Sequence, residues 1–274
     1  MRARPRAETL CIHQDVFSRI RTGEANYLQA YHTTMTQTLD VVIPVLNEEV
    51  DLPPSVERLH EFLTEHLDHM DWRILIADNG STDSTLQACQ ELSNKFERVD
   101  FIRLEQRGRG RALSKAWLES TADIVSYMDV DLSTDIAGFP DLIEAITSGE
   151  YDLAIGSRLT KGSNVIGRSP KREFYSRAYS MVFRTMFLTS FKDAQCGFKA
   201  LSRKAVHELV PLVKDTGWFF DTELLLLAEH NGFRIKELPV KWTEDPDSRV
   251  DVIKTAYLDL RGILRLRFGG RPRI

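Results

Sequence analysis

Residues 124–131 read Ile-Val-Ser-Tyr-Met-Asp-Val-Asp, a short apolar run that ends in two carboxylates one residue apart. Such a short run without charge is typical of a buried β-strand. If the chain stays extended, Asp129 and Asp131 point to the same side. Two neighbouring anions repel each other, and a divalent cation relieves that repulsion while it binds phosphate oxygens. The stretch therefore indicates a metal site at a strand end or, as the alternative, a solvated turn or a helix N-cap over residues 133–135.

Upstream of this stretch, short apolar runs alternate with segments of helical periodicity. The apolar runs are residues 40–45, 73–77 and 99–104, and amphipathic helices are expected after Pro53-Pro54-Ser55, after residue 83 and over residues 112–120. This alternation predicts a doubly wound α/β sheet with parallel strands. Ligands of such sheets bind beyond the carboxyl ends of the strands. The polar clusters 44–49, 78–83 and 129–133 follow three of the predicted strands, so we expect them to form one site. Taken alone, the cluster 78–83 favours a strand–turn–helix connection with a capped helix over a nucleotide-binding role.

The composition limits the classes of function. The chain has 274 residues, with 36 Lys and Arg against 40 Asp and Glu, and a net charge of −4. This balance argues against a dedicated nucleic-acid-binding protein, which carries a basic excess. Three widely spaced cysteines favour neither a disulfide framework nor a zinc site, and they fit a reducing compartment. No apolar run reaches the ~20 residues of a membrane span, and no apolar segment of a secretory signal follows the N-terminal arginines. We therefore expect a cytoplasmic protein.

Two apolar segments suggest contact with a membrane surface. From residue 250 onward, the chain has six Lys and Arg but only two Asp, and apolar residues recur at helical spacing. A basic amphipathic tail favours an anionic leaflet, at about 1 kcal/mol per cation near the surface. Packing on the rest of the chain or on a second subunit of a homo-oligomer is the alternative. Residues 178–191 are too short to span a membrane and suit either a helix in the membrane interface or a core helix.

Further motifs follow the same order as those of a known enzyme family. They are VIPVLNEE at 42–49, DNGSTD at 78–83, GRGRAL at 108–113, DVD at 129–131, GSR at 156–158, DAQCGFK at 193–199 and WFFDTELL at 218–225. Their order and spacing resemble the inverting glycosyltransferases of family 2 with the GT-A fold. More narrowly, they resemble the polyprenyl-phosphate sugar synthases, the group of dolichyl-phosphate mannosyl- and glucosyltransferases. The QCGFK and FFDTELL segments are most similar to the glucosyltransferase branch.

The resemblance covers about residues 39–252 and implies a domain organisation. It implies an α/β fold of GT-A type, with a mixed, mostly parallel sheet flanked by helices in a single catalytic domain. We expect residues 1–38 to be an N-terminal extension, residues 39–248 to be the catalytic domain and residues 249–274 to be an amphipathic basic C-terminal segment.

The resemblance also implies roles for individual residues. The nucleotide sugar would be bound by Pro44, Val45, Leu46, Glu48, Asp78, Asn79, Arg109 and Asp129. Mg²⁺ or Mn²⁺ would be held by Asp129 and Asp131, with Ser133 at a position where relatives often carry a glutamine ligand. The acceptor phosphate would be bound by Arg158, Arg172 and Ser176, and the catalytic residues would be Asp129, Asp131, Asp221 and Glu223.

Two of these assignments keep an alternative when the residues are considered alone. Arg158, Arg172 and their basic neighbours suit phosphate capture, or they form a basic surface loop that binds nothing. Asp221 and Glu223 either orient the sugar or the acceptor, or cap a helix over residues 224–229.

The expected reaction is transfer of a hexose, with glucose favoured, from a nucleotide diphosphate sugar to a polyprenyl phosphate with inversion. UDP-glucose is the first candidate donor and GDP-mannose the second. A lipid monophosphate is largely ionised near neutral pH and is already a nucleophile, so the enzyme must supply mainly positioning and charge stabilisation. The protein would then lie on the cytoplasmic face of an anionic membrane as a peripheral enzyme. The alternatives are a soluble glycosyltransferase with a small acceptor and a non-catalytic nucleotide-sugar-binding protein.

Overall fold

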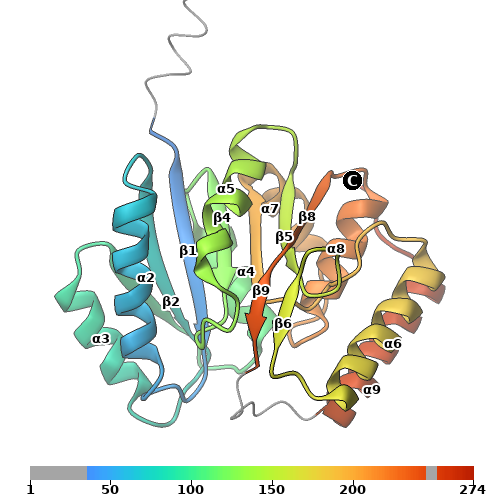
Figure 1. Ribbon diagram of the computed structural model, residues 1–274, viewed down its shortest axis with the longest axis horizontal. Coiled ribbons are helices and arrows are strands. Elements are labelled where there is room, and N and C mark those ends of the chain that lie inside the picture. The colour runs from blue at the N-terminus through green and yellow to red at the C-terminus, as the bar shows by residue number, and fades with distance from the viewer. Residues whose placement is uncertain (1–35, 245–251) are drawn as a thin grey trace, which may run out of the picture. The chain divides into compact units, whose positions relative to one another are not determined.

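The computed structural model describes residues 36–244 and 252–274 (Figure 1). Contacts along the chain divide it into two units, residues 1–36 and 37–274. The first unit, and with it the expected N-terminal extension, lies almost entirely outside the described residues. Everything below concerns the second unit.

A seven-stranded sheet forms the centre of this unit. Its strands are β1 (Thr38–Val45), β2 (Asp71–Asp78), β3 (Val99–Arg103), β4 (Ile124–Met128), β5 (Leu153–Ser157), β7 (Phe198–Ser202) and β8 (Ile235–Pro239), in the order β3-β2-β1-β4-β7-β5-β8. Strand β7 runs antiparallel to its neighbours β4 and β5, and the other pairs in this sheet are parallel. This arrangement confirms the mixed, mostly parallel sheet that the resemblance implied. A second sheet pairs β6 (Asn164–Ile166) with β9 (Lys241–Thr243).

The order of the strands creates a switch point beside β1. The chain passes from β1 to β2 and then β3 on one side, and later returns to place β4 on the other side of β1. Where the connections after two neighbouring parallel strands run in opposite directions, a crevice forms between the loops at the carboxyl ends of these strands. Val45 ends β1 opposite Asp78 of β2, and Asp129 directly follows β4. The three polar clusters therefore meet at one edge of the sheet.

Helices cover both faces of the sheet. One face carries α2 (Leu52–His66), α3 (Thr85–Lys95) and α5 (Phe139–Thr147), which follows the short 3₁₀ turn η1 (Ile136–Gly138). The other face carries α4 (Arg109–Glu119), α6 (Pro170–Phe187), α7 (Arg203–Leu209), α8 (Phe220–His230) and α9 (Val252–Phe268), with the 3₁₀ turn η2 (Val210–Leu212) after α7. Pro53 and Pro54 stand in the first turn of α2, where proline costs no hydrogen bond, as the sequence predicted.

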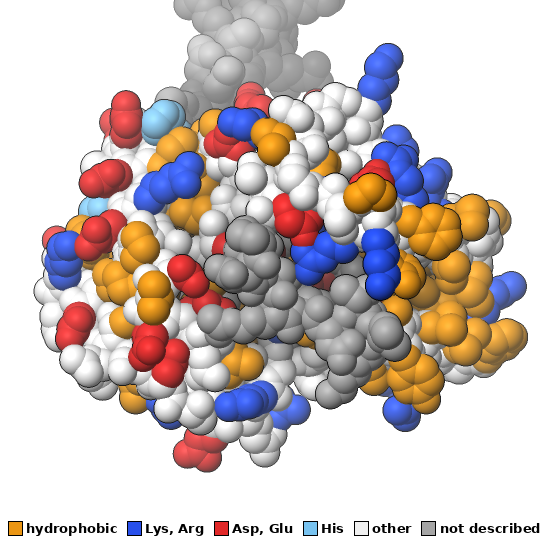
Figure 2. Space-filling model, turned by 60° about the horizontal axis from the view of Figure 1, so that its bottom comes forward, with side chains coloured by type: hydrophobic (Ala, Val, Ile, Leu, Met, Phe, Trp, Pro, Cys, Tyr) orange, Lys and Arg blue, Asp and Glu red, His pale blue; other side chains and the backbone are white. Residues whose placement is uncertain are grey.

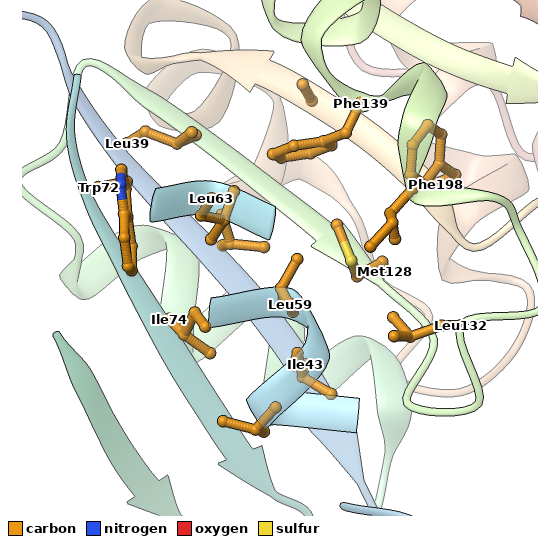
Figure 3. Packing of buried hydrophobic residues seen from close by; sticks show 14 of the residues in the cluster. Leu39, Ile43, Leu59, Leu63, Trp72, Ile74, Met128, Leu132, Phe139 and Phe198 are labelled. Carbon is orange, nitrogen blue, oxygen red and sulfur yellow. The ribbon is translucent and has the colours of Figure 1, made fainter. Parts of the chain in front are cut away.

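The core under α2 shows how the apolar pattern is used. Leu59 and Leu63, one turn apart on α2, lie over the strands that carry Ile43 and Ile74 (Figure 3). All four side chains are fully buried. Removing a buried leucine side chain from such a core typically costs about 2–5 kcal/mol of stability. Close packing here fixes β1 and β2 and, with them, the loops that carry the site.

Helices α6 and α9 contact each other, and each has a buried and an exposed face. Phe183 of α6 and Ile263 of α9 are fully buried, whereas Met181 and Phe268 are 63% and 81% exposed. For both segments the sequence allowed either core packing or membrane contact. Both pack on the domain, and each also has exposed apolar residues. No helix among the described residues is both long and apolar enough to cross a membrane.

Candidate active site

The loop after β1 is held to the loop after β2 by backbone and side-chain hydrogen bonds. Asn47, in a left-handed conformation with φ of 58°, accepts a hydrogen bond from Thr82 N at 2.8 Å and donates its own N–H to Ser81 Oγ at 2.9 Å. Glu48 N donates to Thr85 Oγ1 at 2.8 Å. The expected nucleotide-binding residues Pro44, Val45, Leu46 and Glu48 all lie at the end of β1 or in this loop. The structure therefore brings the first two polar clusters together.

Asp78 ends β2 as a buried carboxylate with one unsatisfied oxygen. Its Oδ1 accepts a hydrogen bond from Ser81 N at 2.9 Å. Its Oδ2 lies 3.3 Å from Nη1 of Arg103 but accepts no hydrogen bond. A buried acceptor without a donor costs free energy, and an N–H group of a bound ligand would recover it.

Asn79 holds the loop that leads to Arg109. Its Oδ1 accepts a hydrogen bond from Gly108 N at 2.7 Å. Gly108 has φ of 153°, and a Cβ there would stand 2.5 Å from the carbonyl oxygen of Thr216, so only glycine fits. Asn79 therefore acts in the structure by fixing the start of α4, where Arg109 is the first residue.

Arg109 joins two carboxylates from distant parts of the chain. Its Nη2 donates to Asp129 Oδ1 at 2.5 Å and its Nη1 donates to Asp221 Oδ2 at 2.7 Å. The guanidinium also lies 4.9 Å from the ring centroids of both Tyr127 and Trp218. Stacking on two rings and pairing with two acids fix its position.

Asp221 is buried among three donors. Besides Arg109, Tyr127 Oη donates to its Oδ1 at 2.5 Å and Lys199 Nζ lies 3.0 Å from the same oxygen. Burial alone favours the neutral acid, but Lys199 and Arg109 outweigh it and hold the pKa of Asp221 below its ordinary value. The ionised carboxylate therefore holds Arg109 in place. It lies within α8, whose N-cap is Phe219, so it does not cap the helix.

Asp129 and Asp131 stand at the edge of the site. Asp129 packs so closely on Gly197 that a Cβ at that position would stand 1.8 Å from its Oδ2, which explains the glycine of the DAQCGFK motif. The side chain of Asp129 is 41% exposed, and Asp131 is exposed, with its Oδ1 accepting a hydrogen bond from Ser133 N at 2.9 Å. A cavity of about 430 Å³ opens beside Asp131 and Ser133.

These residues fit a magnesium or manganese ion that is bound together with a diphosphate. Among the described residues no group of three or more His, Cys, Asp or Glu gathers in one place. Mg²⁺ is usually held by one or two carboxylates, with substrate phosphates and water completing its shell. Two accessible carboxylates, of which Asp131 lines the cavity, match that donor set.

The predicted acceptor-phosphate residues lie in a second cluster. Arg158 donates Nε and Nη2 to Asp193 at 2.8 and 2.9 Å. Burial favours the neutral acid, yet pairing with Arg158 lowers the pKa of Asp193 to about 2. Arg172 pairs with Glu244, and Ser176 is half-buried on α6. These two arginines are thus already bound to acids of the protein itself.

Arg168 belongs to this cluster and was missed by the sequence analysis. Its side chain is only 9% exposed, pairs with Glu173 at 3.1 Å, and keeps an Nε without a hydrogen-bond partner. Arg158 and Arg168 each lie 5.5 Å from the ring centroid of Trp242. Burial and the neighbouring Arg158 lower the pKa of Arg168. An anion bound here would relieve that repulsion.

Glu223 contacts Arg265 and the backbone of Asp215. Its two oxygens accept hydrogen bonds from Arg265 of α9 at 2.9 and 2.6 Å, and one of them also accepts Asp215 N at 2.9 Å. The side chain of Glu223 is 1% exposed. These contacts attach α9 to the start of α8. They give Glu223 a visible structural role, and its expected catalytic role stays a prediction.

The structure therefore separates the predicted residues into three groups. Asp78, Asn79, Arg109, Asp129 and Asp131 surround the carboxyl ends of β2, β1 and β4. Arg158 and Arg172 stand in a separate arginine cluster, and Glu223 contacts α9. Lys199, Tyr127 and Trp218 were not predicted as site residues, although all three lie within the quoted stretches 193–199, 124–131 and 218–225.

Comparison with known proteins agrees with this geometry. The family described as "Glycosyl transferase family 2" matches residues 40–210. Glycosyltransferase AglD of Haloferax volcanii is 36% identical over 217 residues, which cover 79% of this chain but only 35% of AglD. A dolichyl-phosphate beta-glucosyltransferase of Saccharomyces cerevisiae is 31% identical over 240 residues, covering 80% of this chain and 72% of that protein. The corresponding protein of Dictyostelium discoideum is 29% identical and covers 84% of this chain and 74% of its own length.

Solved structures show the same fold. The glucosyl-3-phosphoglycerate synthase of Mycobacterium tuberculosis, in complex with Mn²⁺, UDP-glucose and phosphoglyceric acid, matches with a TM-score of 0.64 and 20% identity, over 86% of this chain and 81% of that one. The fold is that of the glycosyltransferases of GT-A type. The chain belongs to glycosyl transferase family 2.

Proposed function

We propose that this protein transfers a hexose, with glucose favoured, from a nucleotide diphosphate sugar to a polyprenyl phosphate with inversion at the anomeric carbon. The observation that carries the proposal is the placement of Asp78, with its unsatisfied oxygen, and of the accessible carboxylates Asp129 and Asp131 at the carboxyl ends of β2 and β4, on either side of β1 at the switch point of the sheet. Several relatives bear the name dolichyl-phosphate beta-glucosyltransferase, which supports this acceptor and this sugar.

The donor is UDP-glucose in this proposal, with GDP-mannose second. Oδ2 of Asp78 accepts an N–H of the nucleotide, within the pocket formed by Pro44, Val45, Leu46 and Glu48. Asp129 and Asp131 hold Mg²⁺ or Mn²⁺, with Ser133 beside them. The bound cation neutralises the charge that develops on the leaving nucleoside diphosphate. Arg109, next to Asp129, supplies a second positive charge to the same group.

The reaction itself needs no strong base. An oxygen of the ionised acceptor phosphate attacks the anomeric carbon, the bond from that carbon to the diphosphate oxygen breaks, and the electron pair leaves with the nucleoside diphosphate. No proton has to be removed from the acceptor, because a phosphate monoester has a second pKa of about 6. Fully paired Asp221 fits this scheme, since its task is to hold Arg109.

The acceptor phosphate binds at the arginine cluster in this proposal. The sequence prediction assigns this role to Arg158, Arg172 and Ser176. The structure adds Arg168, whose Nε has no hydrogen-bond partner. Burial opposes the charge of Arg158, but Asp193 and, to a smaller extent, Asp129 hold the pKa of Arg158 above its ordinary value. A phosphate there takes the place of, or joins, the acids that now neutralise these arginines.

We also propose that the enzyme works at the surface of an anionic membrane. Most of the exposed large hydrophobic side chains among the described residues lie on α6 and α9 or directly after α6. Figure 2 shows them gathered on the side where these helices lie in Figure 1, with basic side chains between them. Such a face suits the boundary between lipid headgroups and acyl chains.

The test is a transfer assay with a panel of donors and two kinds of acceptor. Purified protein with Mn²⁺ is given labelled UDP-glucose, GDP-mannose or UDP-N-acetylglucosamine, and either a polyprenyl phosphate or a water-soluble phosphate ester. Label that enters the organic phase from one donor, and is lost with a chelator, supports the proposal. Label that enters only the water-soluble acceptor contradicts the lipid acceptor. Nucleotide binding without any transfer indicates the non-catalytic alternative.

A further inference from the structure

Three arginines gather around a cavity where the C-terminal ends of α6, α8 and α9 meet. The cavity has a volume of about 250 Å³ and is lined by Arg267, Arg271 and Arg273, with His230 and Phe187 among its other walls. None of the residues assigned above to the donor or the acceptor lines it. It is a separate feature of the molecule.

The positive charge of this cavity is not neutralised within the described residues. Arg265, one turn away, pairs with Glu223, whereas no described acid lies within ion-pair distance of Arg267, Arg271 or Arg273. The nearest acid of α8, Glu229, accepts hydrogen bonds from Ser190 N and Oγ at 2.7 and 2.6 Å. Burial and the proximity of Arg267 and Arg273 lower the pKa of Arg271, and the charge of Glu229 offsets only part of that effect. The cluster repels itself, and a bound anion relieves that repulsion.

The backbone next to Arg271 and Arg273, and the side chain of Arg271, are held by contacts within the protein. Asn231, at the end of α8, donates Nδ2 to the carbonyl of Pro272 at 3.2 Å and accepts Ile274 N on its Oδ1 at 3.0 Å. The guanidinium of Arg271 lies 5.1 Å from the ring centroid of Phe187. A preformed group of cations costs less side-chain entropy on binding than a mobile tail does.

Exposed apolar residues adjoin this cavity on both helices. Leu188, directly after α6, is 87% exposed, and Phe268, at the end of α9, is 81% exposed. Along α6, Phe174, Met181 and Leu188 recur every seven residues. On α9, Tyr257, Leu260, Leu264 and Phe268 recur every three or four residues. Each set forms one stripe on its helix, and both stripes end beside the arginines.

We propose that this cavity binds the phosphate of an anionic phospholipid headgroup while Leu188 and Phe268 enter the acyl boundary. Anionic oxygens match the guanidinium groups, and the apolar stripes single out a lipid over a free phosphate or a nucleic acid. The proposal deepens the membrane attachment proposed above and rests on it only in placing α6 and α9 against the bilayer. The site is distinct from that of the lipid acceptor, so it anchors the enzyme without taking part in transfer.

The test is vesicle flotation in the absence of donor, acceptor and metal. Vesicles of phosphatidylcholine alone are compared with vesicles of equal parts phosphatidylcholine and phosphatidylglycerol. The wild-type protein is expected to float with the anionic vesicles only. The triple variant Arg267→Gln, Arg271→Gln, Arg273→Gln is expected to lose affinity by about 100-fold, since each cation near an anionic surface adds about one factor of five. A matched triple variant, Lys95→Gln, Arg98→Gln, Lys115→Gln, changes the net charge equally on other elements and is expected to float like the wild type.

Further arms separate the sources of binding. Leu188→Ser with Phe268→Ser is expected to weaken flotation while all three arginines remain, and thermal melting checks that each variant is folded. Equal flotation of the arginine variant and the wild type overturns the proposal, as does an equal loss in the matched variant. If inorganic phosphate or glycerol phosphate releases the protein from anionic vesicles at a concentration similar to that of the phospholipid, the cavity binds a free anion and the lipid assignment is wrong. Because no sugar transfer is measured, failure of the proposed reaction leaves this result unaffected.

Discussion

Arg109 donates a hydrogen bond of 2.5 Å to Asp129, the carboxylate that we expect to hold the divalent cation. In the absence of ligand the guanidinium therefore neutralises the charge that a metal ion would neutralise. Asp221 holds the other side of the same guanidinium at 2.7 Å. We therefore expect a metal ion and Arg109 to compete for Asp129 until a diphosphate, which attracts both, is bound. The geometry thus favours binding of the cation together with the nucleotide.

The first prediction concerns this competition. Arg109→Gln removes the positive charge beside Asp129, so Mn²⁺ is expected to bind the nucleotide-free protein on the order of 10-fold more tightly. The same variant is expected to bind UDP more weakly, because a charge near the diphosphate is lost. Titration followed by Mn²⁺ electron paramagnetic resonance measures both effects, with Arg98→Gln as the control at a distant exposed arginine. Unchanged or weaker Mn²⁺ binding by Arg109→Gln contradicts the competition.

The second prediction concerns the unsatisfied oxygen of Asp78. Asp78→Asn removes one carboxylate oxygen and places a donor in the pocket, so UDP affinity is expected to fall by about 10-fold or more. Titration calorimetry with UDP and Mn²⁺ measures it. Asp71→Asn, at the exposed opposite end of the same strand, serves as the control and is expected to leave the affinity unchanged. Wild-type affinity in Asp78→Asn would remove Asp78 from the nucleotide site.

The third prediction separates a structural from a catalytic role for Glu223. Its buried carboxylate accepts two hydrogen bonds from Arg265, so Glu223→Gln leaves Arg265 without its counter-charge. We expect a loss of about 2 kcal/mol in the free energy of unfolding and little change in kcat at low temperature. Denaturant titration and steady-state kinetics check the two parts. When Arg265→Met is already present, the further change Glu223→Gln is expected to lower the free energy of unfolding much less than it does in the wild type. A double-mutant cycle measures this difference. A large loss of kcat at unchanged stability supports the catalytic role instead.

The fourth prediction is a pH dependence that comes from Asp259 of α9. Burial raises the pKa of this carboxyl to about 7, with Asp215 and Asp221 adding to the rise and a hydrogen bond of 2.6 Å from Gln195 opposing it. The folded state binds the proton more tightly than the unfolded state, so the free energy of unfolding falls as the pH rises from about 4 to about 7 and is level above that.

Asp259→Asn is expected to remove this slope and to be more stable than the wild type by about 2 kcal/mol at about pH 8. Denaturant titrations at about pH 5 and about pH 8 measure the difference. Asp141→Asn, at an exposed position on α5, is the control and is expected to keep the wild-type slope. Parallel pH profiles of Asp259→Asn and the wild type would show that the buried carboxyl does not titrate in this range.

Much of the fold could be predicted because local patterns determine it. The strands at 40–45, 73–77 and 124–128 are short apolar runs, and the sheet contains them within two residues at each end. The antiparallel direction of β7 could not be predicted from a local pattern of this kind. Lys199 is the second residue of this strand and is fully buried, and its partner Asp221 is far away in the sequence. A buried lysine becomes intelligible only once its counter-ion is in place.

The site residues also divide into those that the strand pattern predicts and those whose contacts only the folded chain creates. Asp78, Asp129 and Asp131 follow strands, so topology alone brings them together. Arg158 was expected to be available for a phosphate, yet it is paired with Asp193, a contact that only the folded chain creates. The periodicity of α9 predicts two faces but does not say that Ile263 turns inward and Leu264 outward.

The central claim is tested most directly by transfer of labelled glucose from UDP-glucose to a polyprenyl phosphate in the presence of Mn²⁺, measured in the organic phase for the wild type and for Asp131→Ala. Asp131 is exposed, so its removal is expected to leave the fold intact. We predict chelator-sensitive label in the lipid phase with the wild type and none above background with Asp131→Ala. Absence of lipid-bound label with the wild type, or equal label with Asp131→Ala, would contradict the account.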